Sequence, residues 1–285
     1  MNLLEKIYEL SEITVTEPLP GGELHLSFVV LVVALSAVLC VTLRNCRDKT
    51  LRATVFVMWL VMLAFEVCKQ LAVSLDTVDG EIIFSYDWGS FPFQLCSTPL
   101  YILPFLALLR DGKARDFCAA YIMTYGLLGG VAVYLFPDTV FDEHLFLNIQ
   151  SMVHHGLQIV SGVLTAVWYR KKCGKGFFMK GHFVFVIMFT VAMLLNTVFY
   201  EFLLDSGRID KDDTFNMFLI SPYMDFDIPL FTDFFNSLSP WAMVCVYFLG
   251  VPVGASVLMS IAYKWNLKSE IKKEIRCIKK NAKRA

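Results

Sequence analysis

Residues 24–43 read LHLSFVVLVVALSAVLCVTL, and the basic run RNCRDKTLR of residues 44–52 follows directly. About 20 mostly apolar residues are enough to cross roughly 30 Å of hydrocarbon as a helix. The same kind of run recurs along the chain. The runs lie at residues 24–43, 53–74, 93–109, 116–136, 145–168, 183–204 and 240–263. The sequence therefore predicts an all-α, polytopic membrane protein with seven transmembrane helices.

The connections between these runs alternate in charge, which predicts the orientation of the chain. Basic residues gather after the first, third and fifth runs and in the tail from Lys264 to Arg284. The opposite connections hold only Lys6, Arg208 and Lys211. Because basic loops stay on the cytoplasmic side, we expect the N-terminus outside and the C-terminus in the cytoplasm.

Composition agrees with a membrane protein. Hydrophobic residues make up 56% of the chain and the mean hydropathy is +0.58, against roughly 45–50% apolar residues in soluble proteins. The net charge of −1 says little about partners, because the two signs are sorted by side. We expect membrane lipids as partners, and no nucleic acid.

The pattern divides the chain into three parts. Residues 1–22 form an external amphipathic segment, residues 23–264 a transmembrane domain with a long external loop at 205–239, and residues 265–285 a basic cytoplasmic tail helix. Such a helix suits the anionic lipid of the inner leaflet. Within the loop, the run NMFLISP at 216–222 is apolar enough to fold back over the outer mouth of the bundle.

Ionisable and polar residues inside predicted spans are candidate site residues, because burying them in a membrane is costly. Most of them fall in the outer half of the bundle. They are Glu66, Lys69, Gln94, Cys96, Ser97, Thr98, Gln150, Ser151, His154, His155, Gln158, Ser161, Asn196 and Glu201. Glu66 and Lys69 are three residues apart, so they share a helix face and can form an ion pair.

Cys96 is the candidate nucleophile of this group. We expect it about one turn into a helix that starts at Pro92, where free N–H groups favour a thiolate. A thiolate needs a base, and a neutral imidazole is the usual one, so His154 or His155 would serve. The alternative is a packing thiol beside two buried, hydrogen-bonded histidines. The histidine and cysteine spacings match no metal site, and we expect neither metal nor cofactor.

Several short motifs together resemble the YwaF-like family of bacterial integral membrane proteins over residues 20–265. They are Phe93-Gln94-Leu95-Cys96-Ser97, Gly129-Gly130 with Phe136-Pro137-Asp138, His154-His155-Gly156, and Asn216-Met217-Phe218-Leu219 before Pro222. The family is distantly similar to a eukaryotic transmembrane acyltransferase that remodels ether phospholipids through a cysteine acyl-enzyme and a histidine.

This resemblance implies a multi-pass protein of the bacterial plasma membrane that acts as a lipid-directed thiol acyltransferase or hydrolase. Cys96 would be the nucleophile and His154 the base, with His155 as the alternate. The residues expected to bind substrate are Glu66, Lys69, Gln94, Ser97, Thr98, Gln158, Asn196, Glu201 and Asn216.

The sequence also fits two other functions. A proton-coupled transporter or permease of a small solute would use Glu66, Lys69, His154 and Glu201 as a polar half-channel. A membrane scaffold or sensor would instead need only the basic tail. The sequence leaves open the acyl donor, the acceptor and the oligomeric state.

Overall fold

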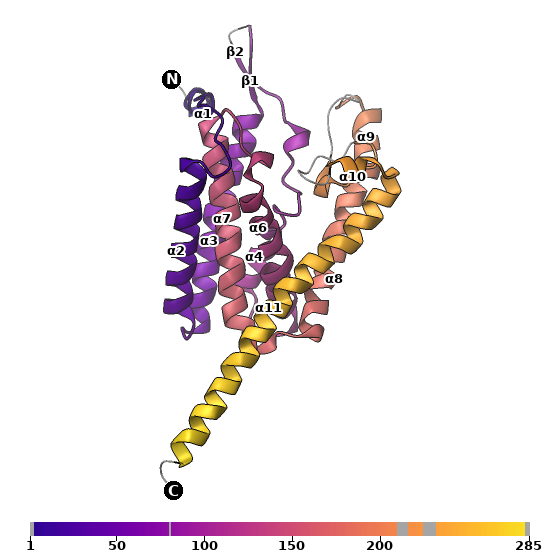
Figure 1. Ribbon diagram of the computed structural model, residues 1–285. Coiled ribbons are helices and arrows are strands. Elements are labelled where there is room, and N and C mark those ends of the chain that lie inside the picture. Colours follow the sequence, from indigo (N-terminus) through magenta and orange to yellow (C-terminus); the bar gives the residue numbers. More distant parts are fainter. Residues whose placement is uncertain (1–2, 80, 210–215, 225–231, 283–285) are drawn as a thin grey trace.

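The computed structural model describes residues 3–79, 81–209, 216–224 and 232–282, and most of them are helical (Figure 1). Within these residues, five helical stretches are long and apolar enough to cross a membrane. They are α2 (Glu23–Leu43), α3 (Asp48–Val73), Lys113–Leu135, Lys175–Asp205 and Pro240–Lys268. The chain is therefore a multi-pass membrane protein.

The other two predicted spans have a different character. Helix α7 (Leu145–Tyr169) is 25 residues long and packs against α2, α3 and α6 (Figure 1). Its many buried polar residues set it apart from the five apolar stretches. Helix α4 (Pro99–Leu108) has only 10 residues, too few to cross a bilayer alone. The count of seven spans thus stays a prediction.

The predicted start of the third helix is wrong. Residues 91–98 form turns, and α4 begins at Pro99 rather than near Pro92. Proline suits the first turn of a helix, where its missing N–H costs nothing. The carbonyl of Leu95 instead accepts a hydrogen bond from Thr98 Oγ1 at 2.7 Å, which closes the turn before the helix.

Two long helices, each with a π-helical turn inside it, come later in the chain. Helix α5 (Lys113–Tyr121), the π-helix η2 (Ile122–Gly126) and α6 (Leu127–Leu135) run on from one another. Likewise, α8 (Lys175–Leu194) continues through a second π-helix, η5 (Leu195–Phe199), into α9 (Tyr200–Asp205). A π-helix carries an extra residue per turn and is common at functional sites.

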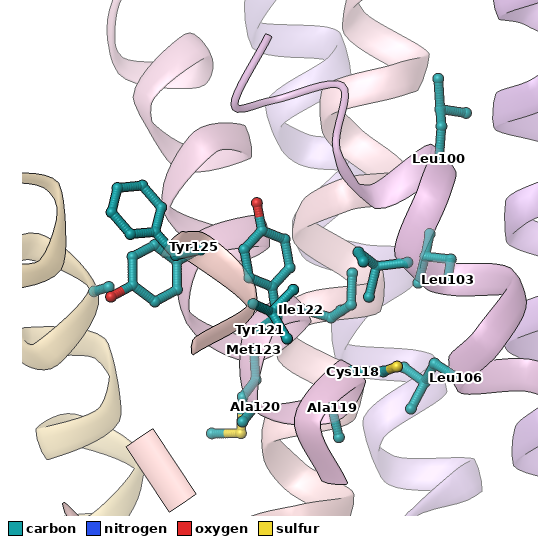
Figure 2. Packing of buried hydrophobic residues seen from close by; sticks show 14 of the residues in the cluster. Leu100, Leu103, Leu106, Cys118, Ala119, Ala120, Tyr121, Ile122, Met123 and Tyr125 are labelled. Carbon is teal, nitrogen blue, oxygen red and sulfur yellow. The ribbon is translucent and has the colours of Figure 1, made fainter. Parts of the chain in front are cut away.

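The apolar core lies where α4, α5 and α8 meet. Leu103 and Leu106 of α4 lie beside Cys118 of α5 (Figure 2). The stacked rings of Tyr121 and Tyr125 extend this core towards α8, with their centroids 5.5 Å apart. Both rings are fully buried, so the middle of the bundle is tightly filled.

One face of α8 comes very close to α5. A Cβ atom added at Gly181 would lie 2.9 Å from the carbonyl carbon and oxygen of Ala120. Small residues permit such close contacts between membrane helices. Close packing here fixes the backbone at Tyr121, and the Tyr121 hydroxyl contacts Thr98 next to the candidate site.

The all-α prediction omits one element. Strands β1 (Leu75–Val78) and β2 (Glu81–Phe84) form an antiparallel hairpin that projects from the end of α3 (Figure 1). A short 3₁₀-helix, η1 (Trp88–Ser90), follows it. The connection between α3 and α4 is therefore structured in its described residues.

The ends of the chain lie at opposite ends of the bundle (Figure 1). Helix α1 (Leu3–Ser11) packs against α3 and α7, and Thr14 bridges to His144 before α7. The last helix, α11 (Pro240–Ala282), is a single helix of 43 residues. The predicted tail helix is thus a continuation of the last span, and its side chains from Lys272 onwards lie outside the described part. Which end faces the cytoplasm stays a prediction.

The remaining short helices lie in the connections. They are η3 (Pro137–Thr139), η4 (Arg170–Lys172), η6 (Met217–Leu219) and α10 (Thr232–Asn236). Part of the predicted loop 205–239, at residues 210–215 and 225–231, lies outside the described residues.

Candidate functional site

Cys96 lies in the turn that precedes α4 and faces Gly129 of α6, next to α7. A Cβ atom placed on Gly129 of α6 would lie 3.2 Å from Cys96 Cα and 3.0 Å from Gln158 Nε2 of α7. A side chain at this position would crowd both neighbours. Gly129 therefore brings the thiol residue and the Gln158 amide together.

His154 is the histidine that contacts Cys96. Its ring is buried, and Nε2 lies 3.2 Å from the Cys96 carbonyl oxygen. On the other side of the ring, Nδ1 lies 3.9 Å from Oε2 of Glu66. The imidazole thus lies between the main chain of Cys96 and the Glu66 carboxylate.

Glu66 is held by neighbours on two helices. Oε1 accepts a hydrogen bond from Gln70 at 2.8 Å and lies 3.6 Å from Lys69 Nζ, so the ion pair expected from the spacing forms. Oε2 accepts a hydrogen bond from Gln150 of α7 at 3.2 Å. Glu66 is only 5% exposed. These contacts hold its carboxylate in a position that faces His154.

His155 faces a different direction. Its Nδ1 lies 2.7 Å from the carbonyl oxygen of Ser151, one turn earlier in α7. The two histidine rings are 5.3 Å apart between centroids. His155 borders the site, whereas His154 contacts Cys96.

Unpaired polar atoms surround Cys96. His154 Nδ1, His155 Nε2, both amide atoms of Gln158 and Gln94 Oε1 are buried without a hydrogen-bond partner among the described residues. Each such group costs about 1–3 kcal/mol of stability, and native structures hold few of them. Their concentration around one cysteine indicates a site that binds a polar group.

A segment of the long connection covers this site. Met217, Phe218 and Ile220 are all 0% exposed. Asn196, in the π-helix η5, donates to the Met217 carbonyl at 2.8 Å and accepts from the Met217 N–H at 2.7 Å. Residues 216–221, which we call the cover segment, are thereby fixed to the bundle.

Three predicted substrate-binding residues prove to hold the cover segment. Gln94 Nε2 donates to the Asn216 carbonyl at 2.6 Å, and Asn216 Oδ1 accepts from the Ser221 N–H at 2.9 Å. Asn196 holds the next residue, as described above. The structure brings Gln94, Asn196 and Asn216 together near Cys96, and leaves Gln94 Oε1 as their unpaired atom.

The remaining predicted residues differ in their surroundings. The Thr98 hydroxyl is engaged with the Leu95 carbonyl and, at 2.6 Å, with the Tyr121 hydroxyl. Ser97 is buried beside Cys96. Glu201 is exposed on α9 and is hydrogen-bonded to Tyr223, so it takes no part in the Cys96 cluster.

Sequence reasoning missed one neighbour of the site. Tyr121 fixes the Thr98 hydroxyl, but in the sequence it is one of many aromatic residues in an apolar run. Gln150, which holds the Glu66 carboxylate, was a candidate because it is one helical turn before His154 on the same helix face.

Comparison with known proteins identifies a family. Residues 21–263 match the model of the TMEM164 family. No curated protein and no solved structure matches the chain. The matched region contains every residue of the Cys96 cluster, and it leaves out α1 and the end of α11.

Proposed function

The chain belongs to the TMEM164 family, and we propose that it is a membrane enzyme that moves a fatty-acyl group through a thioester on Cys96. One observation carries this proposal. The His154 ring lies between the backbone carbonyl of Cys96 and the Glu66 carboxylate, in a buried cluster with unpaired polar atoms. A nucleophile, a base and a group that orients the base are the parts that thiol catalysis needs.

Each residue has a role in the first half of the reaction. His154 takes the proton of the Cys96 thiol, and the thiolate attacks the ester carbonyl of a phospholipid acyl chain. The ester C–O bond then breaks, and the lysolipid oxygen leaves with the proton from His154. Glu66 acts as a positioning residue, because its carboxylate favours the ring orientation and the charge that His154 gains.

The second half restores the enzyme. The hydroxyl of an acceptor lysolipid, or water in a hydrolase, gives its proton to His154 and attacks the thioester. The C–S bond breaks, and the Cys96 sulfur recovers its proton. Acyl transfer and hydrolysis thus share one intermediate and differ only in the acceptor.

Gln158 and Ser97 are the candidate donors to the oxyanion. The Gln158 amide and Cys96 both lie close to Gly129, and the amide has no partner among the described residues, so it is free to donate. Thr98 is less suited, since its hydroxyl already contacts Leu95 and Tyr121. Loss of one oxyanion donor typically raises the barrier by about 3–4 kcal/mol.

The resemblance to the YwaF-like family supports this chemistry, because the cysteine and histidine of that comparison fall on Cys96 and His154. It also supports a bacterial plasma membrane, in which α7, and α4 together with the turns that precede it, complete seven crossings with the N-terminus outside. In that orientation Lys69 meets the lipid phosphate, and the basic end of α11 lies on anionic inner-leaflet lipid.

A proton-coupled transporter fits the site less well. It needs a polar path on both sides of the cluster. The cover segment closes one side with Met217 and Phe218, and the core of Figure 2 fills the middle of the bundle with apolar side chains. A scaffold would not need a buried set of unpaired polar atoms.

Replacing each histidine separately tests the proposed base. We expect His154→Ala to lower acyl transfer by about 10²–10⁴-fold, the usual contribution of a general base. His155→Ala is the matched control on the next residue, and we expect it to keep most of the activity. The measurement follows transfer of a fluorescent acyl chain from a phospholipid to a lysolipid by purified protein in vesicles. Full activity in His154→Ala would exclude it as the base.

A further inference from the structure

A cleft of about 410 Å³ lies between α3 and the segment that leads into α4. Its volume is in the range of binding sites for small ligands, roughly 300–1,000 Å³. Apolar side chains form most of its walls, and two polar residues of α3 lie among them. The lining residues are Leu63, Glu66, Val67, Gln70, Leu71, Pro92, Leu100 and Tyr101.

The cleft opens towards hydrocarbon. Helix α3 is one of the five membrane-length stretches, and its residue Val67, on the cleft wall, is 51% exposed. Val57 and Leu60 on the same helix are 59% and 44% exposed. In a membrane such residues contact lipid chains, so the medium at the mouth of the cleft is the bilayer interior.

The polar end of the cleft leads directly to the candidate site. The Glu66 carboxylate lines the cleft and also lies 3.9 Å from His154 Nδ1. Only the Glu66 side chain therefore separates the cleft from the His154 ring. A chain that fills the cleft would have its polar end beside Glu66 and Gln70.

The neighbouring groups suit the polar part of a lipid. Lys69 Nζ, 27% exposed and 3.6 Å from Glu66, offers a cation for a phosphate. Gln70 donates to Glu66 and to the Ser90 carbonyl, and its oxygen accepts from Tyr86 at 2.8 Å. Burial and the carboxylates of Asp87 and Glu66 raise the pKa of Tyr86, so this hydroxyl stays a donor and keeps Gln70 in place.

We propose that this cleft is a lateral binding site for one acyl chain of a membrane phospholipid. The chain lies along Leu63, Val67 and Leu100, the ester group lies near Glu66, and the phosphate reaches Lys69. Lipid binding follows from the cleft and its position alone. Delivery of the ester to Cys96 rests on the proposed function.

Photo-crosslinking tests the site without relying on catalysis. The Cys96→Ser protein is placed in phosphatidylcholine vesicles that contain a phosphatidylcholine with a diazirine in one acyl chain. After illumination, the labelled residues are mapped by mass spectrometry. We expect labels concentrated on residues 63–71 and 100–101, above the level on the lipid-facing stretch around Val57. Even labelling along the exposed face of α3 would overturn the proposal.

A pair of matched variants makes the test sharper. Val67→Trp fills the cleft, whereas Val57→Trp adds the same bulk to an exposed position of α3 outside it. We expect only Val67→Trp to lower the labelling of residues 100–101 to the level around Val57. Unchanged labelling in Val67→Trp would overturn the proposal.

The outcomes separate this inference from the proposed function. Concentrated labelling together with an unreactive Cys96 would support the lipid site and remove the enzyme. An acylated Cys96 without labelling in the cleft would support the enzyme and show that lipid enters elsewhere.

Discussion

Cys96→Ala is expected to abolish acyl transfer while the protein remains folded in the membrane. Removing the nucleophile of a catalytic group that acts as a unit typically costs about 10³-fold or more, up to roughly 10⁶. The fold should persist, because Cys96 lies in a turn at intermediate burial and loses only one atom. The measurement compares the initial rate of acyl transfer with the thermal midpoint of the same preparation.

Cys118→Ala is the matched control. This thiol is buried in α5, in the core shown in Figure 2, so its loss should lower stability slightly and leave the rate near that of the unmodified protein. A Cys96→Ala protein that keeps more than about a tenth of the activity would remove the thioester mechanism. Retained transport of a solute by Cys96→Ser would favour the transporter instead.

Gly181→Ala is expected to destabilise the bundle strongly. The added Cβ would lie 2.9 Å from the Ala120 carbonyl and 3.1 Å from the Tyr121 nitrogen, and backbone atoms have little freedom to move aside. Overpacking of this kind costs about 1–3 kcal/mol, which exceeds the gain of up to about 1 kcal/mol in helix propensity. Thermal unfolding in detergent measures the change.

Gly176→Ala on the same helix is the control, since nothing lies within 4 Å of its added Cβ. There the gain in helix propensity acts alone, and we expect an equal or higher thermal midpoint. A Gly181→Ala protein as stable as Gly176→Ala would show that α5 and α8 are not in such close contact.

The apolar runs predicted most of the helices because membrane insertion depends on local hydrophobicity. Residues 24–43 and 240–263 coincide with parts of α2 and α11. The run 93–109 was wrong at its start because residues 93–98 are held in turns by contacts that the local sequence does not contain. The bond from Gln94 to Asn216 spans 122 residues. The hairpin of β1 and β2 was not predicted, because the sequence pattern indicated an all-α protein.

The candidate site was predictable where its geometry is local. The spacing of Glu66 and Lys69 predicted their ion pair, and the run at 216–222 is apolar because it packs onto the bundle. The position of Gln158 and Cys96 close to Gly129 was not predictable, since it depends on three segments that meet there. The choice between His154 and His155 as the contact of Cys96 likewise needed the rotation of α7.

The most direct test of the central claim is a search for an acyl thioester on Cys96. The purified protein is incubated with phospholipid of a single acyl composition and examined by intact-protein and peptide mass spectrometry. The account predicts a mass increase equal to that acyl group on the peptide with Cys96, removable by hydroxylamine and weaker in His154→Ala. An unmodified Cys96 in protein that demonstrably binds the phospholipid would contradict it.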